Sequence, residues 1–137
     1  MKKLTIVFLL FTVSRGWAAD GVAMFQSGLK AFQESGPDAL MSTWYSSRDD
    51  VDKVAAIRAK LTTMTRNLGS VMDTEIFAPC LLGKNVQRLY GVIYFDKRPL
   101  WIRADFYSIN GHGGFISIDC SLSHDEIFPV GWVASQN

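Results

Sequence analysis

The sequence predicts one α+β domain in which three N-terminal helices pack on a curved four-stranded antiparallel sheet. Two observations support this fold class. Apolar residues recur at spacings of three and four from residue 22 to residue 68, which is the period of amphipathic helices. After Gly69 the period changes to alternation, which indicates strands with two different faces. Because all the predicted helices precede all the predicted strands, we expect an antiparallel meander with the helices on one of its faces.

The helical part divides into three helices. Gly36 suits the end of the first helix, and Pro37 suits the first turn of the second. We expect Ser46 or Ser47 to cap the third helix, which Gly69 ends. The apolar positions are Val22, Phe25, Leu29 and Phe32 in the first helix, Leu40, Met41, Trp44 and Tyr45 in the second, and Val51, Val54, Ile57, Leu61, Met64 and Leu68 in the third.

The strand part is centred on a hairpin that turns at residues 96–99. We expect Phe95 to lie opposite Leu100, which separates the side chains into two sets. The apolar set, expected to face the helices, is Leu89, Gly91, Ile93, Ile102, Ala104 and Phe106; the outer set includes Tyr90, Tyr94, Trp101, Arg103 and Tyr107.

Two further strands complete the predicted sheet. The first, residues 70–82, contains Pro79, which removes a backbone donor and favours an edge position. The last, residues 115–123, follows a glycine-rich turn at residues 110–114. We expect its apolar face to carry Ile116, Ile118, Cys120 and Leu122.

The first 19 residues have the composition of a secretory signal peptide. Lys2 and Lys3 precede an apolar run, and small residues surround a cleavage site after Ala18 or, less favourably, Ala19. The apolar run is about half as long as a membrane span requires. We therefore expect a periplasmic or secreted protein without a membrane span after cleavage. The chain divides into a signal peptide (1–19), one α+β domain (20–123) and a C-terminal tail (124–137).

Cleavage changes the charge of the chain. Loss of Lys2, Lys3 and Arg15 takes the basic residues from 14 to 11, against 13 acidic ones. The chain lacks the basic stretch that nucleic-acid binding requires, so we expect no nucleic-acid partner.

From Val22 to about Leu122, the order of elements resembles the nuclear-transport-factor-2-like superfamily, also called the cystatin-like α+β fold. The resemblance rests on the helices, on the step from Leu68-Gly69 into the first strand, and on the three closing strands. The chain also resembles small exported bacterial members of that group with no assigned function. The superfamily includes isomerases, dehydratases and non-catalytic binding domains, so the resemblance implies a fold and leaves the function open.

No motif indicates a catalytic, metal or cofactor site. His112-Gly113-Gly114 is similar to the oxyanion loop of some esterases, but the chain has no G-x-S-x-G elbow. His112 and His124 lie in unrelated places, whereas a metal site needs several ligands at suitable spacing. We expect the glycines to form a turn, and we expect no cofactor.

Three charges interrupt the sheet: Arg103, Asp105 and Asp119. Pairing of the last two strands places Arg103 near Asp119. An acid/base cluster in a pocket is one interpretation. A cross-strand ion pair on the outer face is the favoured one, because the charges share that face with Trp101 and Tyr107.

The residues Tyr90, Tyr94, Trp101, Arg103 and Tyr107 are the candidate binding site. Tyr, Trp and Arg are enriched at protein interfaces, so we expect a contact surface, first for a second copy of the chain. The alternative is that the tail, through Phe128 and Trp132, covers the aromatic side chains.

Cys80 and Cys120 form a candidate disulfide, since exported proteins fold in oxidising compartments. In a plain meander, however, two strands separate them, which exceeds the span of a disulfide. The sequence leaves both outcomes open.

These features favour an exported, non-catalytic binding or protein-interaction domain over an enzyme. The alternative is a small isomerase- or dehydratase-like enzyme with an apolar pocket between helices and sheet. The expected partners are a second copy of the chain, a small hydrophobic ligand or another secreted protein.

The signal peptide generates the first prediction. N-terminal sequencing of the exported protein should begin at Ala19 or Asp20, because small residues precede these positions. A membrane-embedded product that retains Met1 would contradict the prediction.

Overall fold

The computed structural model describes residues 16–46 and 48–132. Three helices precede the strands, which confirms the predicted fold class. Most of the predicted signal peptide, residues 1–15, lies outside the described residues, and the first helix begins at Gly16. The elements are α1 (Gly16–Ser35), α2 (Pro37–Trp44), α3 (Val51–Thr65), β1 (Val71–Ile76), β2 (Cys80–Leu81), β3 (Val86–Phe95), β4 (Pro99–Ile109), β5 (His112–Ser121) and a short 3-10 helix (His124–Glu126).

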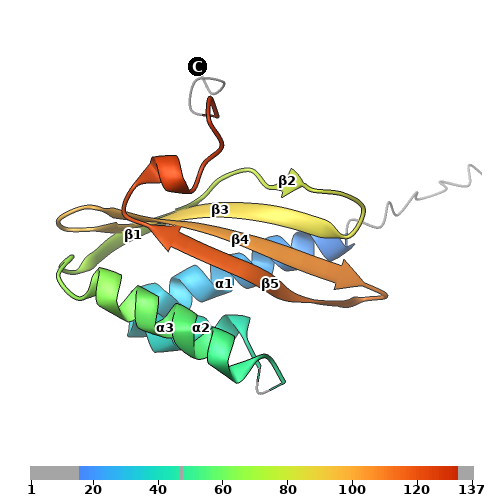
Figure 1. Cartoon of the computed structure of the whole chain (residues 1–137), viewed down its shortest axis with the longest axis horizontal. Coiled ribbons are helices and arrows are strands. Elements are labelled where there is room, and N and C mark those ends of the chain that lie inside the picture. The colour runs from blue at the N-terminus through green and yellow to red at the C-terminus, as the bar shows by residue number, and fades with distance from the viewer. Residues whose placement is uncertain (1–15, 47, 133–137) are drawn as a thin grey trace, which may run out of the picture.

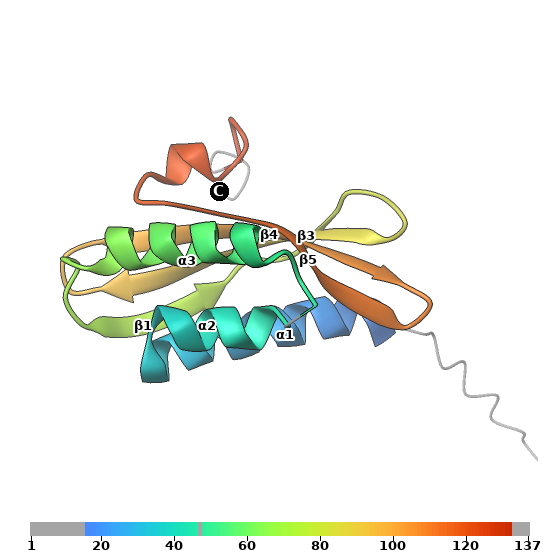
Figure 2. The same cartoon turned by 60° about the horizontal axis from the view of Figure 1, so that its bottom comes forward.

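The sheet lies between the helices and the end of the chain. All three helices cover one face, here called the inner face, and the segment after β5 crosses the other, outer face (Figure 1). Figure 2 shows α2 beside α3, with α1 behind α2, and α1 and α3 make the main helix contacts with the strands. None of the helices in the described ranges has the length and apolarity that a membrane crossing needs.

The strand order is β1-β3-β4-β5, with β2 also paired to β3. The predicted first strand is therefore two strands, β1 and β2, that pair with different parts of β3. Pro79 lies between them, where its missing N–H interrupts no ladder. The predicted edge position is confirmed.

The pairing of β3 with β4 differs from the predicted register by two residues. Tyr94 lies opposite Pro99 and Ile93 opposite Leu100, whereas the sequence predicted Phe95 opposite Leu100. Phe95 instead stays paired to Val71 of β1. The loop after it is fixed by the segment before β1, since the amide of Asp96 donates to the carbonyl of Ser70 at 3.0 Å. A shift by two preserves the two faces, so the predicted faces are correct although the partners are not.

A bulge in β5 corrects the prediction for that strand. Asp105 lies opposite Ser117 while Phe106 lies opposite Phe115, so Ile116 is an extra residue. Phe115 consequently faces the core at 5% exposure and Ile116 is 48% exposed, the reverse of the expectation. The bulge leaves the carbonyl of Ile116 accessible to Lys53 of α3, whose Nζ donates to it.

The β4–β5 turn is tighter than predicted. It consists of Asn110 and Gly111, which both have positive φ, at 51° and 77°. Positive φ at both central residues is the pattern of a type I′ turn, whose twist suits a two-residue hairpin. Gly113 and Gly114, expected in the turn, belong to β5.

The cap of α3 also differs from the prediction. The carboxylate of Asp50, rather than Ser46 or Ser47, accepts the backbone amides of Asp52 and Lys53. The helix therefore starts about one turn later than predicted. Residue 47 lies outside the described residues.

Aromatic rings fill the centre of the space between helices and sheet. Trp44 stacks on Phe25 with ring centroids 5.0 Å apart and lies 5.0 Å from Phe115. The Trp44 indole N–H donates to the carbonyl of Met24 in α1 at 2.9 Å. The indole ring of Trp44, a residue of α2, therefore contacts both α1 and the sheet.

This meeting point depends on Gly28. A Cβ atom at Gly28 would lie 1.9 Å from Nε1 of Trp44, so α1 can approach the indole this closely only without a side chain there.

We predict that Gly28→Ala destabilises the fold by about 2 kcal/mol or more, because the indole must move and the core must repack. The measurement is chemical unfolding of the purified protein. Gly114→Ala is the matched control, since a Cβ there meets open space. Equal, small effects of both substitutions would show that the contact with Trp44 is not tight.

Candidate functional site

The outer face of the sheet holds all five residues of the predicted binding site, but they do not form one surface. Tyr94 lies at the end of β3 next to Pro99, and Tyr107 pairs with Val86 at the opposite end of the hairpin. Pro99 and Tyr107 are eight positions apart along β4, a distance of about 26 Å. Tyr90, Trp101 and Arg103 lie between them.

The C-terminal segment covers the middle of this face, which is the alternative that the sequence left open. Tyr90 is 2% exposed and belongs to a second apolar cluster with Ile127 and Phe128. The ring of Phe128 stacks on Tyr90 at 4.9 Å and on Trp132 at 4.4 Å. Tyr90 is therefore not available to a partner while the segment is in place.

Trp101 and Phe77 form the sides of this cluster. Phe77 follows β1 and makes edge contacts with Phe128 at 5.5 Å and Trp132 at 5.6 Å. Trp101 contacts Phe128 at 5.6 Å and His124 at 5.9 Å. We call residues 123–132, which lie across these side chains, the strap.

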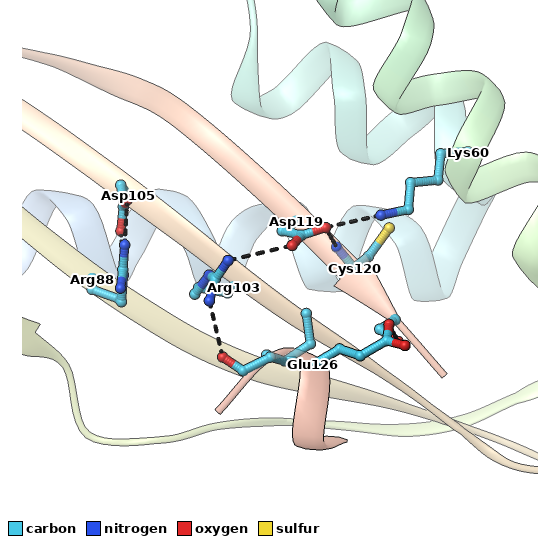
Figure 3. A network of polar contacts seen from close by, with 9 residues as sticks. Lys60, Arg88, Arg103, Asp105, Asp119, Cys120 and Glu126 are labelled. Atoms are coloured by element: carbon cyan, nitrogen blue, oxygen red, sulfur yellow. Dashed lines mark hydrogen bonds and ion pairs between the residues drawn. The ribbon is translucent and has the colours of Figure 1, made fainter. Parts of the chain in front are cut away.

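The predicted proximity of Arg103 and Asp119 is confirmed. The two residues are directly opposite on β4 and β5, and their side chains are 3.3 Å apart. Arg103 also donates to the carbonyl of Ile127 at 3.3 Å, so the same guanidinium holds the strap (Figure 3). Lys60 of α3 donates to the other oxygen of Asp119 at 2.9 Å.

These contacts shift the titration of the carboxylate. Partial burial of Asp119 favours its neutral form, but the hydrogen bond and charge of Lys60, the amide of Cys120 and the charge of Arg103 together lower its pKa below 3.8. The same hydrogen bond raises the pKa of Lys60. Asp119 is thus an ionised link between helix, sheet and strap. The sequence favoured its cross-strand ion pair with Arg103 and did not predict the contact with Lys60.

A second ion pair, Arg88 with Asp105, lies on the outer face between Tyr90, which the strap covers, and Tyr107 at the end of the hairpin. Arg88 donates to both carboxylate oxygens of Asp105 at 2.8 and 2.9 Å, and these contacts raise the pKa of the guanidinium. The two residues are direct cross-strand partners. Two hydrogen bonds from one guanidinium to both oxygens of a carboxylate pair the charges and also fix the orientation of the two side chains.

Tyr94 and Tyr107 lie outside the strap cluster. The hydroxyl of Tyr94 donates to Glu75 of β1 at 2.7 Å, and this hydrogen bond raises the pKa of Tyr94 to about 12. Tyr107 is 37% exposed. Of the five predicted residues, it is the one that presents its ring most openly.

The candidate disulfide is not formed: Cys80 and Cys120 are both free thiols. Cys80 packs against the strap cluster, and Cys120 lies in the inner core. The sheet separates the two side chains, so coiling of the sheet does not bring them together. Burial raises the pKa of Cys120 to about 11.

Among the described residues, no group of three or more His, Cys, Asp or Glu side chains is placed to hold a metal ion. His112 lies on β5 beside the type I′ turn, opposite Ile109. His124 begins the short 3-10 helix, within 2.9 Å of Asp125.

Two clefts lie along α1 on the inner side of the sheet. One, of about 510 Å³, separates α1 from β1, and the other, of about 320 Å³, lies beside the end of β4. The amide oxygen of Gln87, a residue buried near Gly21, has no hydrogen-bond partner among the described residues.

Two residues that shape the site were missed at the sequence level. Phe77 lies in the predicted edge strand, and nothing in the local pattern links it to a strap 50 residues later. Lys60 lies beside Leu61 in the apolar stripe of α3, and its position between Ile57 and Met64 placed it near the sheet. A search for basic side chains flanking the stripe could have found Lys60.

No protein-family model matches the sequence, and no curated protein is similar to it. Several solved structures are similar, and two of them are described here. One is a candidate NTF2-like transpeptidase from Campylobacter jejuni, with a TM-score of 0.47 and 13% identity over 71% of this chain and 95% of that one. The other is an NTF2-like protein of unknown function from Burkholderia xenovorans LB400, with a TM-score of 0.49 and 15% identity over 88% of this chain and 95% of that one. The helices followed by an antiparallel sheet in this chain are consistent with the nuclear-transport-factor-2-like fold.

The ion-pair network generates a pH prediction. Because the pKa of Asp119 is lower in the folded chain, its contacts stabilise the fold above about pH 4 and this contribution is lost as pH falls through the folded pKa. Asp119→Asn should therefore lower stability at pH 7 by up to about 1 kcal/mol, a small effect because the side chain is 40% exposed.

The measurement is urea unfolding at several pH values between 2 and 7. The difference between wild type and Asp119→Asn should shrink as the pH falls below about 4. Asp38→Asn, which removes a largely exposed carboxylate paired with Arg58, is the control. A difference that stays constant down to pH 2 would rule out the ionised link.

Proposed function

We propose that this protein is an exported, non-catalytic binding domain, and that its contact surface is the end of the outer sheet face that the strap leaves open. The observation that carries the proposal is an apolar surface at that end. Tyr107, Ile109 and Leu82 are 37%, 45% and 49% exposed. Val86 lies among them, paired with Tyr107 and bonded through its carbonyl to the amide of Leu82. We call these four residues the open patch.

The local structure keeps the ring of Tyr107 accessible. Its partner on β5 is Gly114, which has no side chain and open space above it. Water-facing strand positions do not require large apolar side chains, and Tyr is enriched where proteins meet. The open patch is therefore better explained as a contact surface than as a solvated one.

The position of the patch defines which partner fits. The Arg88–Asp105 pair lies between the open patch and the strap cluster, so a partner can cover the patch while the strap stays in place. A second copy related by a twofold axis would place the patch against itself and bury all four side chains. We propose this homodimer first and another secreted protein second.

The inner side of the sheet supports binding rather than catalysis. The packed rings of Phe25, Trp44 and Phe115 fill the centre of the space between helices and sheet, so the two clefts lie at its margins along α1. Export is supported by the signal-like composition of residues 1–19.

A second candidate function is a small isomerase- or dehydratase-like enzyme, or a carrier of a small hydrophobic ligand. The observation that favours it is the unpartnered amide oxygen of Gln87, since a buried acceptor suits a ligand with one hydrogen-bond donor. Native mass spectrometry of the exported protein would distinguish the two candidates. A co-purified small molecule that is lost in Gln87→Leu would favour the second.

We predict that Tyr107→Asp combined with Ile109→Asp shifts the exported protein from dimer to monomer, because the two charges would be buried at the interface. Analytical ultracentrifugation measures the shift, and circular dichroism checks that the fold is retained. Val51→Asp, which charges an apolar side chain of α3 that is 73% exposed, is the matched control.

A wild-type protein that stays monomeric at high concentration would contradict the homodimer. In that case a secreted partner captured by the wild type and lost in the double variant would still support the open patch. A secreted partner that the double variant captures as well as the wild type does would contradict the open patch as the contact surface.

A further inference from the structure

The strand β1 has one edge that no described strand covers. It is the first strand in the order β1-β3-β4-β5, and β3 pairs with its other edge. The amide of Phe77, just after β1, donates to the carbonyl of Tyr90 in β3 at 2.9 Å. In an antiparallel ladder, the N–H and C=O of one residue point to one neighbouring strand and those of the next residue point to the other side. Because Phe77 bonds to β3, the N–H and C=O of Ile76 and of Thr74 point toward the open edge. The amide of Thr74 is instead bonded to its neighbour, the Asp73 carboxylate, at 2.8 Å.

A groove runs along this edge. The cleft of about 510 Å³ has α1 on one side and five consecutive residues, 74–78, on the other. The α1 side is formed by Val22, Gln26 and Leu29, whose spacing places them on one face of the helix. A groove between a helix and the open edge of a strand has the shape that an extended peptide requires when it joins a sheet.

The side chains of β1 determine which peptide would fit. Thr74 and Ile76 pair with Ile93 and Gly91, whose face of β3 packs on the helices. Peptide residues opposite them would therefore enter the groove beside Val22, which favours apolar side chains. The intervening positions would lie on the outer face, next to the exposed carboxylates of Asp73 and Glu75.

Charge also argues against a second copy at this edge. Antiparallel pairing of two β1 strands would bring the Asp73 and Glu75 carboxylates of both copies close together, and like charges across strands are destabilising. Basic side chains in the same places would instead form favourable cross-strand pairs.

We propose that the open edge of β1 and the groove beside α1 bind an extended peptide segment as an additional antiparallel strand. The segment alternates apolar side chains, which enter the groove, with Lys or Arg side chains, which face Asp73 and Glu75. This site is separate from the open patch, because it lies on β1 and α1, whereas the patch lies on β3, on β4 and on Leu82, just after β2.

The test uses the exported protein and a fluorescently labelled hexapeptide of alternating Lys and Val, acetylated and amidated at its ends. Fluorescence anisotropy should show saturable binding, and the matched Glu-Val peptide should bind at least about fivefold more weakly, since its charges repel those of β1. Amide hydrogen exchange should slow at Ile76 when the Lys-Val peptide binds, because the Thr74 amide already donates to Asp73.

Backbone methylation of the peptide tests the strand pairing directly. In the antiparallel arrangement, the valine amides face β1 and the lysine amides face solvent. N-methylation of the valines should therefore weaken binding about tenfold or more, while N-methylation of the lysines should leave it nearly unchanged. Any other pattern overturns the proposal, as does a failure of the Lys-Val peptide to bind at millimolar concentration.

Charge reversal on the protein tests the preference for basic peptides. Glu75→Lys should weaken binding of the Lys-Val peptide about fivefold and strengthen binding of the Glu-Val peptide. Glu34→Lys, which reverses an exposed charge near the end of α1, is the matched control. Equal effects of the two substitutions would overturn the role of Glu75. The readout is peptide binding, so it does not depend on whether the protein dimerises through the open patch.

Discussion

Burial of the β3–β4 hairpin on both faces is the constraint on which the rest of the structure depends. On the inner face, the indole of Trp44 joins α1, α2 and the sheet in one packed contact. On the outer face, Phe128 of the strap covers Tyr90. A sheet buried on both sides needs apolar side chains at successive positions. This is why β3 carries buried residues almost without interruption.

The strap, residues 123–132, covers only part of the outer face, and this determines where the proposed contact surface lies. It covers the part of the hairpin around Tyr90 and Trp101 and leaves Tyr107 open. No described strand covers the outer edge of β1, for a different reason: β1 is the last strand at that side of the sheet. The two proposed surfaces therefore differ in chemistry. The open patch offers apolar side chains, whereas the β1 edge offers peptide groups flanked by carboxylates.

The ion pairs position α3, β4 and the strap relative to one another more than they stabilise the fold. Asp119 contacts Lys60 and Arg103, and Arg103 also holds the carbonyl of Ile127, so one carboxylate sets the relation of α3, β4 and the strap. Partly exposed pairs of this kind add little free energy. Their contribution is to fix where the strap lies, while the aromatic rings supply the burial that keeps it there.

The sequence by itself determined the order of helices and strands, the two faces of the hairpin and the approach of Arg103 to Asp119, because each follows from a period that neighbouring residues set. Only the tertiary structure decided the two-residue register shift, since an even shift leaves the alternation unchanged. It also decided that Ile116 is bulged outward and that the strap covers Tyr90 but leaves Tyr107 open. These features depend on contacts between segments far apart in the chain, and no local pattern of residues encodes such contacts.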